Sequence, residues 1–185
     1  MAEHQPGQNK ILIAKPFLHD GFFRRAVILL AEHNDSGSVG FVMNRPASIK
    51  LQDLLTNLKE ADFPVFLGGP VSQDQLFFVH RYGEQINGSL PIGDGYFWNG
   101  DYSDLIQLIR KGNIKSSGIK FFVGYSGWGE GQLQDELQSD SWIVSDANYK
   151  NLMREASNEI WGEELKRIGS NYNVLSNFPQ DPWMN

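Results

Sequence analysis

The chain has 185 residues, no cysteine, and 16 Lys and Arg against 22 Asp and Glu, which gives a formal net charge of -6. A chain of this length buries about 70% of its unfolded surface around one core, and its 41% of hydrophobic residues excludes disordered and fibrous classes. The absence of cysteine excludes a disulfide scaffold, a thiol nucleophile and cysteine-ligated metal centres. The composition therefore predicts one acidic globular domain.

The distribution of charge and hydropathy bears on partners and location. Basic residues come only in pairs, such as Arg24-Arg25, whereas binding to nucleic acid depends on clustered Lys and Arg. No apolar run approaches the roughly 20 residues of a membrane span, and the N-terminal stretch lacks the apolar core of a signal peptide. We expect a cytoplasmic protein that binds neither nucleic acid nor membranes.

The first quarter of the chain predicts strands around one hairpin. Residues 1–9 are polar and predict a flexible tail, and the apolar run 11–14 predicts a first strand. Residues 26–31 and 39–43 are apolar runs on either side of the turn-forming residues 34–37, which is typical of a β-hairpin. Because the run 26–31 is continuously apolar, we expect that strand to be covered on both faces.

The middle of the chain mixes one helix with short strands. Leucines at helical spacing predict a helix over residues 51–58, with Ser48 near its start as the cap. The run Gly68-Gly69-Pro70 predicts a sharp chain reversal. Short strands are expected at 65–67, 76–80 and 96–98.

The rest of the chain mixes helices and strands without regular alternation. Asp101 and Gly112 are typical of the start and end of a helix. The other expected elements are a strand at 119–125, a helix at 132–138, a strand at 142–144, a helix capped by Ser145 or Asp146, a helix from Asn158 to Gly169, and an extended tail at 170–185 whose Phe178 and Trp183 dock on the body. This order predicts an α+β fold with a mixed sheet, in a single domain over 10–169.

The glycine-rich segment 124–131 invites two functional interpretations. A nucleophile elbow would place Ser126 on a strand-to-helix turn, but Trp128 stands at the position of its second glycine and no histidine follows His80. A phosphate loop would need Gly or Ala at Gln132, or a Walker lysine, and neither is present. We interpret the glycines as turns that make room for Trp128, with anion binding by their backbone N–H groups as the alternative.

Histidines and carboxylates form no recognisable metal motif. The 4 histidines show neither H-E-x-x-H nor a short His-x-His spacing. A single histidine at a strand end is typically a hydrogen-bonded structural residue. We therefore expect no metal and no cofactor.

Four separated segments are more specific together than any one motif. They are ILIAKPFLHDGFFRRAVILLAEHNDSGSVGFVMNRP, FLGGPV, FFVH and FVGYSGWGEGQLQDEL, with Trp142 soon after. In this order they resemble the YqgE/AlgH family of bacterial proteins over residues 10–170. The resemblance implies an α+β fold with a barrel-like β-sheet and flanking helices. The AlgH name implies a regulatory role in alginate synthesis, without an established activity, cofactor or ligand.

The resemblance also implies which positions bind a ligand and which maintain the structure. The positions that we assign to ligand binding are His33, Asn44, Arg45, Gly68, Gly69, Gln132 and Glu136. The positions that we assign to the motif and its structure are Pro46, Pro70, His80, Gly124, Gly127, Trp128, Gly131 and Trp142. This chain has Ser126 where the family commonly has Ala, which weakens the case for a nucleophile there.

Arg45 and Glu136 admit two interpretations. In the first, Arg45 pairs with Glu136 as a structural link between the hairpin and the short helix. In the second, Asn44, Arg45, Gln132 and the backbone of the Gly-Gly-Pro turn face a small anionic ligand. We favour the structural link, because buried pairs of arginine and carboxylate often join segments of a fold.

These residues form no catalytic constellation, which favours a non-enzymatic protein. Such a protein would bind a partner protein or a small ligand, with a regulatory outcome. The alternative is an enzyme that acts on a small anionic substrate at a pocket around Asn44, Arg45 and Gln132, with His33 or Glu136 in proton transfer. Convergence of these residues in one pocket would favour the enzyme.

Overall fold

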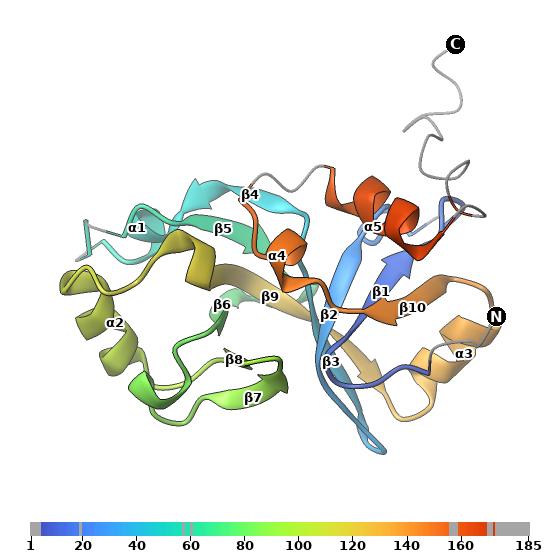
Figure 1. Ribbon diagram of the computed structural model, residues 1–185, viewed down its shortest axis with the longest axis horizontal. Helices are drawn as coiled ribbons and strands as arrows, with labels where there is room; N and C mark the ends of the chain where they lie inside the picture. The colour runs from blue at the N-terminus through green and yellow to red at the C-terminus, as the bar shows by residue number, and fades with distance from the viewer. Residues whose placement is uncertain are drawn as a thin grey trace, which may run out of the picture.

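The computed structural model describes residues 5–18, 20–56, 58–59, 61–155, 159–169 and 172. Within them, one sheet of ten strands is flanked by short helices (Figure 1). The strands are β1 (Lys10–Ala14), β2 (Val27–Asn34), β3 (Gly37–Val42), β4 (Pro46–Lys50), β5 (Pro64–Leu67), β6 (Val71–His80), β7 (Leu90–Gly93), β8 (Tyr96–Trp98), β9 (Ile119–Gly129) and β10 (Trp142–Asp146). The α-helices are α1 (Leu51–Leu54), α2 (Tyr102–Arg110), α3 (Gln132–Gln138), α4 (Tyr149–Leu152) and α5 (Ile160–Ile168).

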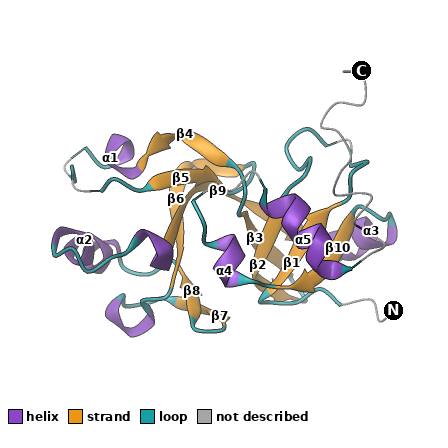
Figure 2. Ribbon diagram, turned by 45° about the horizontal axis from the view of Figure 1, so that its top comes forward, coloured by secondary structure: helices purple, strands orange, loops and turns teal. Residues whose placement is uncertain are grey.

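The sheet is mixed, and the long strand β9 joins its two halves. The strand order is β10-β1-β2-β3-β9-β6-β8-β7, and β4 and β5 join at the side, where β5 pairs with β9 in parallel. The first part of β9 pairs with β5 and β6, and its last part pairs with β3 (Figure 2). Because the described strands end in β10 on one side and β7 on the other, the sheet is open and curled. The predicted α+β class with a mixed sheet is confirmed.

Apolar side chains pack in three clusters against this sheet. The continuous apolar run of β2 serves two of them, since Val27 and Leu29 lie in one cluster and Ile28 and Leu30 in another. The third cluster packs α1 and α2 on β6 and β9. The expectation that β2 is covered on both faces is confirmed.

The hairpin and the helix with the clearest end signals are confirmed. Strands β2 and β3 pair antiparallel and enclose the turn residues 35–36. The side chain of Asp101 accepts hydrogen bonds from two backbone N–H groups of the first turn of α2. Gly112 follows α2 with a φ of 69°, which glycine adopts without steric cost.

The helix predicted over 51–58 is wrong in its extent. Only 4 residues form α1, and Ser48, expected as its cap, lies in β4. Strand β4 pairs with β5, with Lys50 opposite Pro64. Pairing with a distant strand thus decides the conformation of these residues, and local leucine spacing carries no information about it.

The helix expected after β10 is also corrected. Strand β10 continues to Asp146, so neither Ser145 nor Asp146 caps a helix. Helix α4 begins after Asn148 and has 4 residues. Ser145 pairs with Ile11 of β1, which explains why the strand extends past its predicted end.

The glycine segment is mostly strand rather than turn. Strand β9 runs through to Gly129, so Gly127 and Gly129 lie in the strand and not in turns. Gly124 and Gly131 do have positive φ values, of 71° and 73°. The interpretation of these glycines as turns is therefore wrong for Gly124, Gly127 and Gly129, which lie in β9, and holds for Gly131. The expected positive φ is found at Gly124 and Gly131.

Residues near both chain ends contact the body of the protein. The backbone N–H of Asn9 donates to the carbonyl of Leu30 at 3.0 Å, and its side chain accepts from the Tyr149 hydroxyl at 2.8 Å. Tyr172 packs against the cluster that contains Val27. Phe178 and Trp183, expected to dock on the body, lie outside the described residues.

Candidate functional site

A groove of about 430 Å³ lies where the β2–β3 hairpin meets the last part of β9. We name it the hairpin groove. Its lining includes Val39, Val71 and Tyr125, and its one charged lining residue is Glu32. Gly127 and Gly129 of β9 also line the groove and are exposed, so part of its surface is backbone without side chains.

This glycine backbone belongs to a stretch of β9 with one described strand beside it. Strand β6 pairs with β9 only as far as Tyr125, which lies opposite Val71. Gly127 and Gly129 lie beyond that pair, and β3 covers their other side, with Val39 opposite Gly127. The groove therefore follows an incompletely paired edge of the sheet.

Trp128 connects the groove to a polar cluster around Glu136. Oε2 of Glu136 accepts from Nε1 of Trp128 at 2.9 Å and from Nε1 of Trp142 at 2.7 Å. Oε1 of Glu136 accepts from Nε2 of Gln132 at 3.1 Å, and Oε1 of Gln132 accepts from the N–H of Gly129 at 3.1 Å. The structure thus brings four of the sequence-predicted residues together, and they bond to one another.

His33 lies beside the groove and contacts a serine. Its Nδ1 is 2.7 Å from Oγ of Ser38, across the hairpin. A nucleophilic serine and its base make such a contact, but Ser38 is only 6% exposed. Ser126 is also buried and donates to the carbonyl of Gly68 at 3.0 Å. These contacts are those of serines that join neighbouring segments of the fold.

Asn44 stabilises the start of β2. Its Oδ1 accepts from the N–H of Val27, and its Nδ2 donates to the carbonyl of Arg25, each at 2.8 Å. Both ends of the amide are thus bonded to backbone, so the side chain joins the residues that follow β3 to the residues at the start of β2.

The interpretation of Arg45 as a link to Glu136 is wrong. Nη2 of Arg45 donates to the carbonyl of Arg24 at 3.0 Å, and the guanidinium lies 5.0 Å from the ring centroid of Phe22. Burial lowers the pKa of Arg45, and Asp20 raises it. The partners of Arg45 come from the loop before β2, whereas Glu136 is bonded by the two indoles and Gln132.

Gly68 and Gly69 pack against the backbone of β9. A Cβ at Gly69 would lie 2.0 Å from the carbonyl oxygen of Tyr125, and a Cβ at Gly68 would lie 2.3 Å from that of Gly124. Only glycine permits this approach of two backbones. The exposed Pro70 follows directly, and the exposed Pro46 begins β4.

His80 is a buried residue near the C-terminal end of β6. Its Nε2 is 2.9 Å from the carbonyl of Asn99, and its Nδ1 accepts from the N–H of Tyr82 at 3.1 Å. Burial lowers the pKa of His80, and the hydrogen bond with Asn99 raises it. The expectation of a structural histidine at a strand end is confirmed here.

The predicted ligand-binding residues thus lie in separate places. Gln132 and Glu136 belong to the tryptophan cluster, and Asn44 and Arg45 contact the loop before β2. The glycine pair lies against β9. Ligand binding by these residues stays a prediction, and neither Arg45 nor Gln132 lines the hairpin groove.

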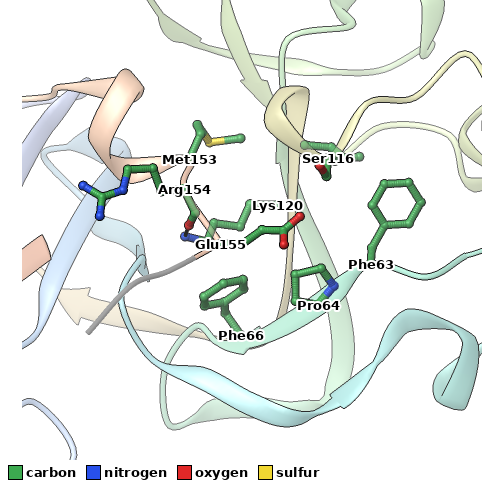
Figure 3. Close-up of a pocket in the computed structure, with 9 residues that line it drawn as sticks. Phe63, Pro64, Phe66, Ser116, Lys120, Met153, Arg154 and Glu155 are labelled. Atoms are coloured by element: carbon green, nitrogen blue, oxygen red, sulfur yellow. Dashed lines mark hydrogen bonds between the residues drawn. The ribbon is translucent and has the colours of Figure 1, made fainter. Parts of the chain in front are cut away.

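Lys120 of β9 is a buried cation that the sequence analysis missed. It is 3% exposed, and its Nζ donates to the carbonyls of Met43 at 2.7 Å, Leu152 at 2.9 Å and Arg154 at 2.8 Å. Nζ also lies 3.9 Å from the ring centroid of Phe66. Figure 3 shows Lys120 beside Phe66 at a cavity of about 10 Å³, the size of a single water.

The groups around Lys120 shift its pKa in opposite directions. Burial lowers the pKa of Lys120 to about 7, while Glu155 raises it and Arg154 lowers it. Three carbonyl oxygens use all three donors of an ammonium group, whereas a neutral amine can serve only two of them. The charged form can therefore join the end of β3 to the end of α4 with all three donors, while burial favours the neutral form.

The described residues contain neither a cluster of metal ligands nor a membrane-spanning helix. No group of three or more His, Asp or Glu residues in this part of the chain is placed to hold a metal ion. No helix in the same part is both long and apolar enough to cross a membrane.

Sequence comparisons match nearly the whole chain. The AlgH-like family model matches residues 11–173. A UPF0301 protein of Cytophaga hutchinsonii is 42% identical over 179 residues, which cover 96% of this chain and 98% of that protein. A UPF0301 protein of Bacteroides fragilis is 41% identical over 181 residues, which cover 97% of this chain and 92% of that protein.

Two solved structures share the fold. The solution structure of the AlgH protein from Pseudomonas aeruginosa has a TM-score of 0.75 and 28% sequence identity. The match covers 97% of this chain and 98% of that protein's chain. The crystal structure of protein DIP2367 from Corynebacterium diphtheriae has a TM-score of 0.82, with coverage of 96% and 95%. At 20% identity, the second likeness concerns the fold alone.

Proposed function

The chain belongs to the AlgH-like family, as its sequence resemblance predicts, and from the surface of this member we propose a non-catalytic binding protein. Its hairpin groove takes an extended segment of a partner protein. Binding without turnover is also how such a protein would exert a regulatory effect, and its composition is suited to the cytoplasm.

The observation that carries this proposal is the exposed glycine backbone in the groove. Gly127 and Gly129 lie in a strand, beyond the last residue that β6 pairs, and no side chain stands on them, although the N–H of Gly129 is already bonded to Gln132. An extended peptide binds such an edge by adding a strand, with its main chain as the source of affinity. The edge thus supplies the part of recognition that is independent of peptide sequence.

The walls of the groove supply the part that depends on sequence. Val71, which is 37% exposed, and the partly buried Val39 and Tyr125 offer apolar contact to alternate side chains of a bound strand. Glu32 is the charged residue of the lining, and the chain carries a net charge of -6. This charge favours a segment with apolar and basic side chains over an acidic one.

A peptide titration tests the proposal. The probe is a synthetic seven-residue peptide of alternating valine and lysine, and NMR follows the backbone amides of the protein. We expect saturable shifts at Gly127 and Gly129. A matched peptide of alternating valine and glutamate should bind more weakly by about tenfold, which corresponds to roughly 1.4 kcal/mol.

A charge reversal in the groove sharpens this test. Glu32→Lys should weaken the binding of the lysine peptide and strengthen the binding of the glutamate peptide. The matched control is Glu84→Lys, which makes the same change at an exposed residue beyond the other end of β6 and should leave both affinities within about twofold. Equal effects of the two variants, or shifts that avoid the two glycines, would overturn the proposal.

A further inference from the structure

A second pocket lies between α4 and α5 and has a different character from the hairpin groove. Its volume is about 310 Å³, and it shares no lining residue with the groove. We name it the α4–α5 pocket. Its charged lining residues are Lys150, Arg154, Glu163, Glu164 and Arg167, whose formal charges sum to +1.

A fully buried carboxylate fixes one of the two arginines of this pocket. Glu164 is 0% exposed and accepts from Nδ2 of Asn151 and from Nε of Arg167, each at 2.7 Å. Nη2 of Arg167 donates to Oγ of Ser145 at 3.1 Å and to the carbonyl of Asp146 at 2.6 Å. Three acceptor atoms therefore hold the guanidinium plane of Arg167 in place before any ligand arrives.

The second arginine is held in the same manner. Nη1 of Arg154 donates to Oδ1 of Asn151 at 2.9 Å and to Oε2 of Glu163 at 2.7 Å. Its backbone is fixed as well, because the carbonyl of Arg154 accepts from Lys120. Asn151 thus bonds to Glu164 with its amide nitrogen and to Arg154 with its oxygen, so it joins the two arginines into one scaffold.

Part of each guanidinium is left without a partner in the described part of the chain. Nη1 of Arg167, and Nη2 and Nε of Arg154, make no hydrogen bond there, and neither does Nζ of Lys150. The two arginine side chains remain 36% and 39% exposed, so solvent reaches them. Two arginines that line the pocket thus retain donors that no described group uses, and a bound ligand can take them in place of water.

We propose that the α4–α5 pocket binds a small oxyanion, a phosphate or a carboxylate group. Guanidinium forks match the paired oxygens of such groups. Arg154 keeps Nε and Nη2 for such a pair, and Arg167 adds the single nitrogen Nη1. Lys150, which is exposed and also lines the pocket, adds a positive charge. This site is independent of the hairpin groove, which favours basic side chains.

An anion titration at constant ionic strength tests this site. The probes are inorganic phosphate and acetate, with chloride as the balancing ion, and NMR follows the amides of residues 148–154 and 163–167. We expect saturable shifts confined to these residues with phosphate, with acetate or with both, and the stronger ligand identifies the oxyanion class. Shifts that fail to saturate with either probe would overturn the proposal.

A pair of lysine variants makes the test specific. Lys150→Gln should weaken the binding of the stronger ligand about fivefold to tenfold, because it removes one exposed cation without touching the buried scaffold. The control Lys111→Gln makes the same change at the exposed residue that follows α2 and should leave the affinity unchanged. Equal losses in both variants would show charge screening instead of a site. Since the peptide titration reports at Gly127 and Gly129, failure of one proposal is distinguishable from failure of the other.

Discussion

Lys120 and the α4–α5 pocket are neighbouring cationic regions that use their donors in opposite ways. Lys120 is buried and gives all three of its N–H donors to backbone carbonyls. Arg154 and Arg167 line the pocket, give part of their donors to the fold and keep the rest without a partner in the described part of the chain. The two regions even share a residue, since Lys120 bonds the carbonyl of Arg154. A cation with every donor used stabilises the fold, and one with oriented donors left over is suited to a ligand.

The largest expected effect on stability is at Lys120. Lys120→Met leaves three carbonyls without their donor, two of them at the end of α4, and should lower the free energy of unfolding by about 3–5 kcal/mol. Urea denaturation measures it. Lys115→Met, at an exposed lysine 5 residues earlier, serves as the control. A loss below about 1 kcal/mol in Lys120→Met would contradict the structural role.

The pH dependence of stability gives a second test of the same residue. Burial lowers the pKa of Lys120 to about 7, against 10.5 for an ordinary lysine, which we take for the unfolded chain. Between these values the unfolded chain binds more protons than the native one, so the free energy of unfolding should rise as the pH rises from about 7 towards 10.5. Lys120→Met should lack this rise. An identical slope in both proteins would show that Lys120 keeps an ordinary pKa.

A smaller loss is expected at Glu136. Glu136→Ala removes the acceptor of both indole N–H groups, Trp128 and Trp142, and should cost about 2–3 kcal/mol. Tryptophan fluorescence during denaturation follows the change directly. The control Asp135→Ala alters an exposed carboxylate on the same helix and should cost less than about 0.5 kcal/mol. Similar losses of stability in the two variants would mean that the effect comes from helix α3 and not from the hydrogen bonds to the two indoles.

The smallest effect on stability is expected in the α4–α5 pocket. Lys150→Gln should change the free energy of unfolding by less than about 0.5 kcal/mol, because Lys150 is exposed and makes no hydrogen bond in the described part of the chain. The same variant should weaken oxyanion binding. If Lys150→Gln lost about as much stability as Lys120→Met, the distinction between a structural region and a binding region would be wrong.

Sequence reasoning succeeded where the determining contacts are local. The β2–β3 hairpin and the cap of α2 follow from turn residues and from Asp101, whose partners lie within three positions. The continuous apolar run of β2 likewise indicated burial on both faces. The family could be recognised because several segments in order are specific together.

Sequence reasoning failed where partners are far apart in the chain. Strand β4 depends on β5, and Arg45 depends on Phe22 and Arg24, so neither could be found from local spacing. Lys120 gave only a weak signal, a lysine inside the apolar strand IKFF, because its acceptors are at least 32 positions away. The glycines stand out in the sequence, but only the pairing pattern of β9 shows that Gly127 and Gly129 lie beyond its pairing with β6.

The most direct measurement is an NMR titration that follows the side-chain nitrogens of Lys120, Arg154 and Arg167 in one sample. Phosphate and acetate are added in turn at constant ionic strength. The prediction is that the two guanidinium signals shift and saturate with at least one of the anions, while Nζ of Lys120 stays in place because its donors are already used. Saturable shifts at Lys120, or guanidinium signals that do not respond to either anion, would contradict the distinction between a structural cation and a binding one.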